Sequence, residues 1–246
     1  GESYWEPEVV NGALRGRSAK WLQEEQERDP LGFMTQWQAR PPSAQGAIFR
    51  YFPEYEELPE EGEVLQSWDT AFEKGARADY NVCGTWLKAR GKVYLIDVFR
   101  QKCEFAELEE HGARIAAGAV AQWGHKPFIL VENKSSGAAL VSKLRQAGFP
   151  TKAYNPGESV PYLKGVRRGT PDLVIRAGPV VKFFDSGQVM VPKEWKPWKE
   201  PYISELKAFP HGRHDDQVAM TVQLLEWVFH TQPLVLPKYE VTYGRV

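Results

Sequence analysis

Four acidic side chains occupy segments of this sequence where an unpaired charge would be costly. One lies within VLQSWDTAF, which has the pattern of a buried strand, and another ends the apolar run FILVE. Two adjacent acids open the amphipathic segment HDDQVAMTVQLLEWVFH. An ionised carboxylate in apolar surroundings needs a compensating cation, which is either a basic side chain or a metal ion. The four acids are Asp69, Glu132, Asp215 and Asp216.

If these carboxylates converge, their mutual repulsion favours a divalent cation among them. Ligand sets made only of oxygen favour Mg²⁺ or Mn²⁺ over zinc. Two such ions about 3.5–4 Å apart are the usual apparatus for in-line displacement at phosphorus: one activates water and the other stabilises the leaving oxygen. The sequence therefore predicts a phosphodiester hydrolase with one or two Mg²⁺ or Mn²⁺ ions as cofactor, held by Asp69, Glu132 and Asp215 or Asp216 as metal ligands and catalytic residues.

Structural roles remain open for each acid taken alone. Asp69 could close a bulge or pair with an arginine, and Glu132 could favour the N-terminus of the helix that follows it. Asp215 and Asp216 stand where aspartate is a preferred N-cap. A shared site requires that the elements carrying these residues bring them to one point.

The hydrophobic pattern predicts those elements. Three strands joined by short loops form an antiparallel meander, with RGK as one tight turn, and helices then alternate with strands. This order is typical of an α/β fold whose mixed sheet is flanked by helices on both faces. A sheet that places the first strand beside the fourth brings two of the acids to one edge, where the last helix can add the others. The predicted strands cover 64–72, 80–89, 92–100, 127–134 and 151–155, and the predicted helices cover 104–124, 135–148, 201–210 and 214–230.

Two further segments have weaker signals. The turn-like residues Asp185, Ser186 and Gly187 separate two apolar runs, so a hairpin is predicted over 180–192. The basic segment 162–178 is expected to be helical in part.

The composition limits the class of protein. The chain has 246 residues and a net charge of −1, so nucleic acid would have to be bound by a local basic patch. Cys83 and Cys103 lack metal-type spacing and are expected to stay reduced. The apolar runs are too short to span a bilayer, and GESYWEPEVV lacks the features of a signal peptide. We expect no membrane association.

Six blocks of sequence, in order, resemble the C-terminal nuclease domain of a tailed-phage or prophage terminase large subunit. They extend over roughly residues 63–230, and FMTQWQARPPSAQGAIF resembles the segment that joins the ATPase domain of such proteins to the nuclease domain. The Walker A pattern is absent, which implies a piece without the ATPase motor. The blocks are SWDTAFEKGARADYNVCGTWLK, YLIDVFRQKCEFAEL, ILVENKSSGAALVSKLR, KGVRR, GQVMVP and FPHGRHDDQVAM.

The resemblance implies a ribonuclease H-like fold and an endonuclease that cuts double-stranded DNA concatemers with Mg²⁺ or Mn²⁺ during genome packaging. By motif, Asp69 matches the first metal ligand, Glu132 the second, and Asp215 with Asp216 the third position. Many relatives carry a further acid where this chain has Ala219, which puts a second metal in doubt. The implied partners are DNA, the terminase small subunit and the portal, in the host cytoplasm.

The domain boundaries expected from the resemblance are a helical and linker segment over 1–62, the nuclease domain over 63–232 and a C-terminal tail over 233–246. Positive charge for DNA phosphates is concentrated in YLKGVRRGTPDLVIR. Phosphate contacts without base contacts would make cutting tolerant of sequence. The predicted DNA-binding residues are Arg77, Lys134, Lys164, Arg167 and Arg168, with Arg176 in the same basic stretch.

Two alternatives remain open at this stage. A resolvase-like nuclease of the same fold would prefer branched over linear duplex. A catalytically silent domain that grips DNA or docks to the portal would bind without metal-dependent cutting. Ala219 keeps the second alternative open.

Overall fold

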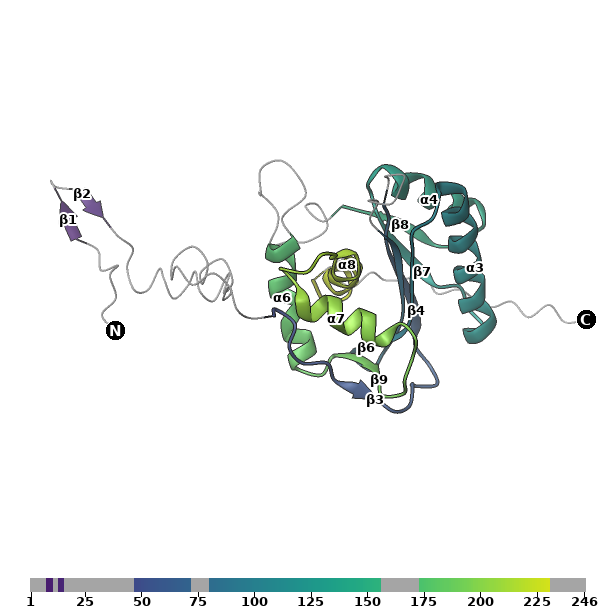
Figure 1. The fold of residues 1–246 in the computed structure, drawn as a ribbon, viewed down its shortest axis with the longest axis horizontal. Helices are drawn as coiled ribbons and strands as arrows, with labels where there is room; N and C mark the ends of the chain where they lie inside the picture. The colour runs from purple at the N-terminus through teal and green to yellow at the C-terminus, as the bar shows by residue number, and fades with distance from the viewer. Residues whose placement is uncertain (1–7, 11–12, 16–46, 72–79, 156–172, 231–246) are drawn as a thin grey trace, which may run out of the picture.

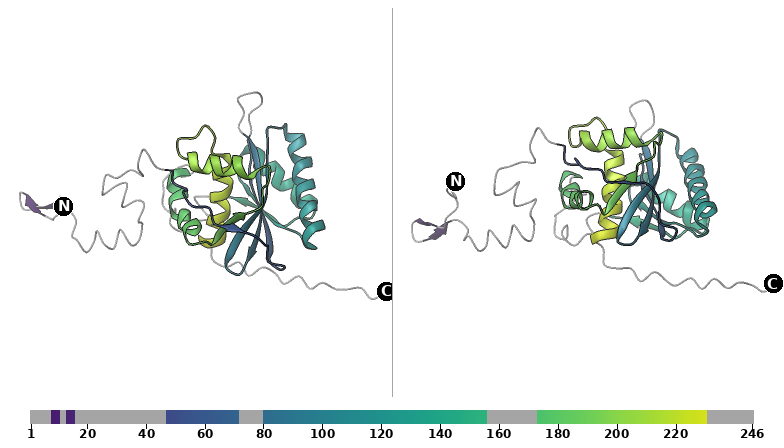
Figure 2. Two further views of the ribbon diagram at one scale, coloured as in Figure 1. Left: turned by 60° about the horizontal axis from the view of Figure 1, so that its bottom comes forward. Right: turned by 90° about the horizontal axis from the view of Figure 1, so that it is seen from below.

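The computed structural model describes residues 8–10, 13–15, 47–71, 80–155 and 173–230. Its main body is a seven-stranded mixed sheet between two layers of helices (Figure 1). The predicted α/β class, with helices on both faces of the sheet, is confirmed. One face is covered by α3 (Phe105–Trp123) and α4 (Ser135–Gln146), and the other by α6 (Leu173–Asp185), α7 (Lys199–Ala208) and α8 (Asp216–His230) (Figure 2).

The sheet is built around the predicted antiparallel meander of β4, β5 and β6. β7 and β8 continue it beside β4 with parallel pairing, and β9 and β3 continue it beside β6, also in parallel. The strand order β3-β9-β6-β5-β4-β7-β8 thus places the first strand of the meander next to β7. The bounds are β3 (Glu54–Tyr55), β4 (Glu63–Asp69), β5 (Asn81–Ala89), β6 (Lys92–Gln101), β7 (Phe128–Glu132), β8 (Thr151–Tyr154) and β9 (Val189–Pro192); β1 (Glu8–Val10) and β2 (Ala13–Arg15) form a separate antiparallel pair.

The hairpin predicted over 180–192 is wrong. Its first half is the end of α6, and its second half is β9, which pairs in parallel with β6 and β3. The residues taken for a hairpin turn terminate the helix: Gly187 has φ 70°, its N–H donates to the Phe184 carbonyl, and the Gln188 N–H donates to the Phe183 carbonyl. This is a Schellman ending, which needs glycine as much as a tight turn does.

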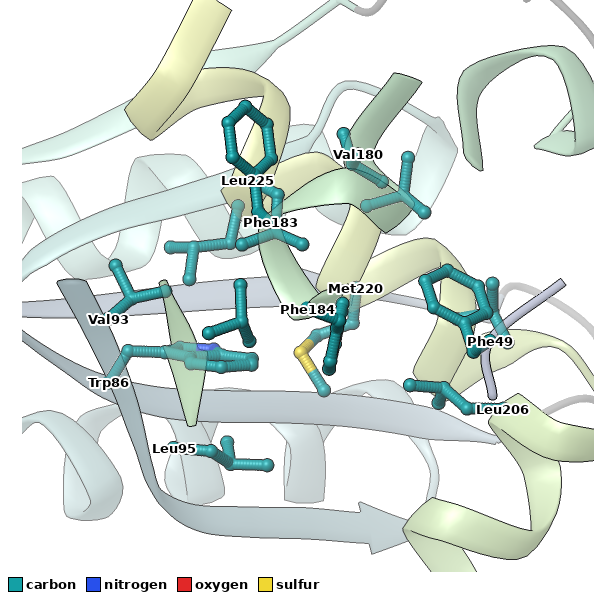
Figure 3. Packing of buried hydrophobic residues seen from close by; sticks show 14 of the residues in the cluster. Phe49, Trp86, Val93, Leu95, Val180, Phe183, Phe184, Leu206, Met220 and Leu225 are labelled. Carbon is teal, nitrogen blue, oxygen red and sulfur yellow. The ribbon is translucent and has the colours of Figure 1, made fainter. Parts of the chain in front are cut away.

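Alternation along the strands divides the core between the two faces of the sheet. In β7, Ile129 and Val131 pack in the cluster with α3 and α4, whereas Leu130 packs in the larger cluster on the opposite face. In Figure 3 that larger cluster joins Trp86 and Val93 of the sheet to side chains of α6 and α8. Because successive strand residues point to opposite faces, Glu132 belongs to the face that α8 covers.

Residues 47–62, from the end of the predicted 1–62 segment, contribute to the same body. Phe49 is fully buried in the larger cluster, and β3 pairs with β9. The helix expected at the start of this segment and the tail after 232 lie outside the described residues, so the domain boundaries stay a prediction. Within the described part of the chain, no helix is both long and apolar enough to cross a membrane.

Candidate active site

The parallel pairing of β4 with β7 brings two of the predicted acids together. Trp68 lies opposite Val131 in this register, so Asp69 and Glu132, one residue further along, end the two strands side by side. Trp68 and Val131 both pack toward α3 and α4. By alternation, Asp69 and Glu132 both point to the face that carries α8.

Hydrogen bonds fix α8 against the same end of β4. The Ser67 hydroxyl donates to the Met220 carbonyl over 2.8 Å. The Gln223 amide nitrogen donates to the Ser67 hydroxyl over 2.9 Å and to the Trp68 carbonyl over 3.3 Å. These contacts hold the start of α8 near the end of β4, and both Asp215 and Asp216 interact electrostatically with Asp69.

The four acids therefore share one site, but they differ in exposure. Glu132 is 3% exposed and Asp216 is 6% exposed, whereas Asp215 is exposed to solvent. The pKa of Asp69 is raised from 3.8 to about 8: burial is the largest cause, the charges of Glu132, Asp216 and Asp215 add to it, and the charge of Lys134 opposes it. Three neighbouring carboxylates thus disfavour ionisation of Asp69, and Lys134, among the described residues, opposes them.

Lys134 is the basic side chain placed directly at these acids. Its Nζ lies 3.0 Å from Glu132 Oε2. Burial lowers the pKa of Lys134, but the charges of Asp69 and Glu132 outweigh that effect, and the pKa is raised. Glu132 Oε1 is buried and has no hydrogen-bond partner among the described residues, so one lysine does not satisfy the site.

A hard divalent cation suits this set of donors. All four acids offer oxygen, and Glu132 Oε1 is buried with no hydrogen-bond partner among the described residues. No three His, Cys, Asp or Glu side chains in the described segments already lie in a metal-holding arrangement. The carboxylates are gathered at one edge, but side-chain adjustment is needed before three of them can bind one ion.

The start of α4 closes the site from the other side. The Thr70 and Ser136 hydroxyls lie 2.9 Å apart in a buried hydrogen bond, so the residue after Asp69 is tied to α4. A Cβ on Gly137 would collide with the Glu132 carbonyl oxygen. Glycine in SSG therefore allows α4 to begin directly behind the end of β7.

Of the five predicted DNA-binding residues, the structure describes one. Lys134 is described, and its side chain is 54% exposed beside the acids. Arg77, Lys164, Arg167 and Arg168 lie outside the described residues.

The inclusion of Arg176 in the DNA-binding stretch is wrong. Arg176 is 3% exposed, and its guanidinium pairs with Glu226 over 2.8 Å. The segment becomes α6, and helical geometry turns this arginine toward the core.

Sequence reasoning missed Glu205 in α7. This carboxylate is buried and accepts two hydrogen bonds from Gln217, the residue after Asp216. A signal was available: Glu205 follows Tyr202 by three residues and precedes Leu206, so helical spacing places it on the buried face of the predicted helix.

The family model described as Terminase RNaseH-like domain matches residues 66–226. The chain belongs to this family. The matched segment runs from β4 into α8 and contains all four acids of the site. The ribonuclease H-like fold and the resemblance to terminase nuclease domains are thereby confirmed.

Comparison with solved structures finds terminases at low sequence identity, one of them with a TM-score above 0.5. A large terminase from the thermophilic bacteriophage D6E has a TM-score of 0.55 and 14% identity; the match covers 85% of this chain and 52% of that chain. The large terminase nuclease from thermophilic phage G20c, with bound magnesium, gives 0.49 and 16%, covering 75% and 97%. The human cytomegalovirus terminase nuclease domain, Mn soaked and inhibitor bound, gives 0.47 and 9%, covering 72% and 88%.

At sequence identities this low, structural similarity shows a shared fold and does not show a shared activity. The chain spans about half the length of the D6E large terminase it matches. No curated protein matches the chain.

Proposed function

We propose that this chain is a metal-dependent endonuclease that cuts double-stranded phage DNA concatemers during genome packaging. It would act as the nuclease domain of a terminase large subunit in the host cytoplasm, together with the small subunit and the portal. The observation that carries the proposal is the gathering of four acids at the shared ends of β4, β7 and α8, where burial together with the neighbouring acids raises the pKa of Asp69 to about 8. Membership of a family of terminase nuclease domains supports it.

In this proposal the four acids hold Mg²⁺ or Mn²⁺. Asp216 is the stronger candidate of the adjacent pair, because it is buried and acts on Asp69 more strongly than Asp215 does. A bound divalent cation would supply Lewis-acid chemistry, activating water and stabilising the phosphoryl oxygens. Ala219 lies one helical turn after Asp215 and offers no carboxylate for a second ion. The proposal therefore includes one ion or two.

The chain's own residues orient the reaction. Glu132 is held at the strand end with one oxygen on Lys134 and the other uncompensated. The half-exposed Lys134 ammonium can contact a phosphate beside the acids. Arg77, Lys164, Arg167 and Arg168 are proposed to grip the DNA backbone further out, without base contacts.

Cleavage of supercoiled plasmid tests the proposal in Mg²⁺, in Mn²⁺ and in EDTA. We expect nicking and linearisation that require the metal and fall by about 100-fold or more in Asp69→Asn, because an electrostatic group at the reaction centre is lost. Asp97→Asn is the matched control, since Asp97 is an exposed acid of the same sheet, in β6, two strands away from Asp69. Full activity of Asp69→Asn would disprove the assigned role of Asp69.

A silent domain that grips DNA or docks to the portal is the second candidate. Ala219 favours it, as does the absence of a ready three-ligand arrangement in the described segments. A folded protein that binds duplex DNA but cuts it in neither metal would establish this alternative. Preference for branched over linear duplex would instead indicate a resolvase-like nuclease.

A further inference from the structure

The first turn of α8 is held from both sides by residues outside the acidic site. Glu205 of α7 accepts a hydrogen bond from the Gln217 backbone N–H at 2.6 Å and another from the Gln217 side-chain amide at 2.6 Å. Gln217 directly follows Asp216. The Glu205 contacts therefore fix the backbone at the residue adjoining a predicted ligand.

Glu205 is suited to this contact by its charge as well as by its position. The backbone N–H groups of a helix's first turn have no partner inside the helix, and a negative charge beside them is favourable. The Glu205 side chain is 7% exposed, and Arg100 Nη2 lies 3.4 Å from its second oxygen. Arg100 supplies the counter-charge that makes burial of this carboxylate tolerable.

Arg100 links this contact to the edge where the acids gather. It lies opposite Val82 in β5, which lies opposite Asp69 in β4. Directly opposed residues in neighbouring strands share a face, so Arg100 and Asp69 belong to the same row, two strands apart. Glu205 thus bridges that row to the start of α8.

His214, the residue before Asp215, is also held in place by ring contacts. The Arg100 guanidinium lies over the Tyr80 ring, 3.5 Å from its centre, and the Tyr80 ring meets the His214 ring edge-on at 5.1 Å. His214 and Gln217 flank the two acids. Contacts from Tyr80, which precedes β5, and from α7 therefore bracket Asp215 and Asp216, and Arg100 of β6 contacts both groups.

We propose that Glu205 is a positioning residue of the acidic site, holding the start of α8 so that Asp215 and Asp216 face Asp69 and Glu132. This inference rests on the proposed function, because it concerns the same acids. Glu205 itself takes no part in the chemistry: both of its oxygens are engaged with Gln217.

Mn²⁺ titration by calorimetry, together with cleavage kinetics, tests this role in the whole chain. In Glu205→Ala we expect the Mn²⁺ dissociation constant to rise about 10-fold, the usual scale for losing a residue that supports a metal ligand. We expect kcat to fall while KM for DNA stays unchanged. Glu205→Gln keeps an acceptor for the Gln217 N–H and is expected to recover most of the loss; Glu200→Gln, an exposed acid of the same helix, should have no effect.

Unchanged Mn²⁺ affinity in a folded Glu205→Ala would overturn the positioning role. If that variant does not fold, Glu205→Asp keeps the charge but shortens the reach: weaker Mn²⁺ binding supports the role and unchanged binding overturns it. A parent protein that binds Mn²⁺ without cutting would defeat the proposed function alone, because weaker Mn²⁺ binding by Glu205→Ala would still support positioning. A parent that does not bind Mn²⁺ would defeat both.

Discussion

Two buried charge clusters lie on the face of the sheet that α8 covers, and they differ in balance. In the first, Arg176 pairs with Glu226 over 2.8 Å, and the Tyr154 hydroxyl donates to the same carboxylate over 2.8 Å. Arg176 is 3% exposed, and Glu226 and Tyr154 are completely buried. One cation and one anion are matched, and the cluster joins α6, α8 and β8.

The second cluster is unbalanced. Among the described residues, Asp69, Glu132, Asp215 and Asp216 gather beside Lys134, and His214 lies 3.8 Å from Asp216. Burial and the neighbouring acids raise the pKa of Asp69. The comparison teaches that burial of an acid does not by itself indicate chemistry. A matched acid stabilises the packing of elements, whereas several acids gathered at one strand edge, with a raised pKa among them, mark a candidate functional site.

Breaking the balanced cluster should have the largest effect on stability. Arg176→Ala leaves Glu226 buried without its cation, and we expect the free energy of unfolding to fall by about 3–5 kcal/mol. Urea denaturation measures this. The paired replacement Arg176→Met with Glu226→Leu should recover most of the loss, because it removes both charges. If Arg176→Ala lowers the free energy of unfolding by no more than the loss of a surface ion pair does, Arg176 and Glu226 do not form a matched buried pair.

Neutralising the unbalanced cluster should act in the opposite direction, and its effect should depend on pH. The folded-state pKa of Asp69, about 8, lies above the ordinary 3.8. The folded protein therefore retains a proton that the unfolded chain loses. The stability this provides is complete below about pH 4 and is lost as the pH rises through about 8.

Asp69→Asn removes that loss. We expect the variant to be more stable than the parent at about pH 9 by on the order of 1–2 kcal/mol, after discounting for solvent screening at the open edge. The difference should vanish near pH 4. Thermal unfolding across this range, in EDTA, measures it. A variant less stable than the parent at high pH would show that Asp69 is compensated like Glu226.

The smallest expected effect comes from Lys134, which joins the acidic cluster from its exposed side. The Lys134 side chain is 54% exposed although its partner Glu132 is buried, so Lys134→Met should lower the free energy of unfolding in EDTA by only about 1 kcal/mol. The thermal stabilisation by added Mn²⁺ should increase, since a competing cation is gone. Lys143→Met is the control. Lys143 lies in α4 and pairs with Glu109 of α3, so its replacement should leave the Mn²⁺ effect unchanged.

Much of the site could be predicted from the sequence because its signals are local. Asp69 and Glu132 interrupt or end apolar runs, and Asp215 and Asp216 precede an amphipathic helix. The elements that carry them were all predicted, and the structure brings the four residues together.

The errors arose where one local signal fits two structures. DSG at 185–187 terminates a helix here, although it is equally typical of a hairpin. Arg176 was counted with neighbouring basic residues, but its direction depends on α8, whose Glu226 lies 50 residues away. Glu205 was missed because its partner Gln217 is in a different helix.

The sequence by itself determined most of the segments that form strands and helices, though not the segment 180–192, and which side chains carry charge. Periodicity and residue type are sufficient for that, since they reflect the burial of individual residues along each element. Only the tertiary structure decided which charges meet. The parallel pairing of β4 with β7 and the packing of α8 leave one group of acids in excess and match another with Arg176, because charge balance depends on neighbours that are distant in the chain.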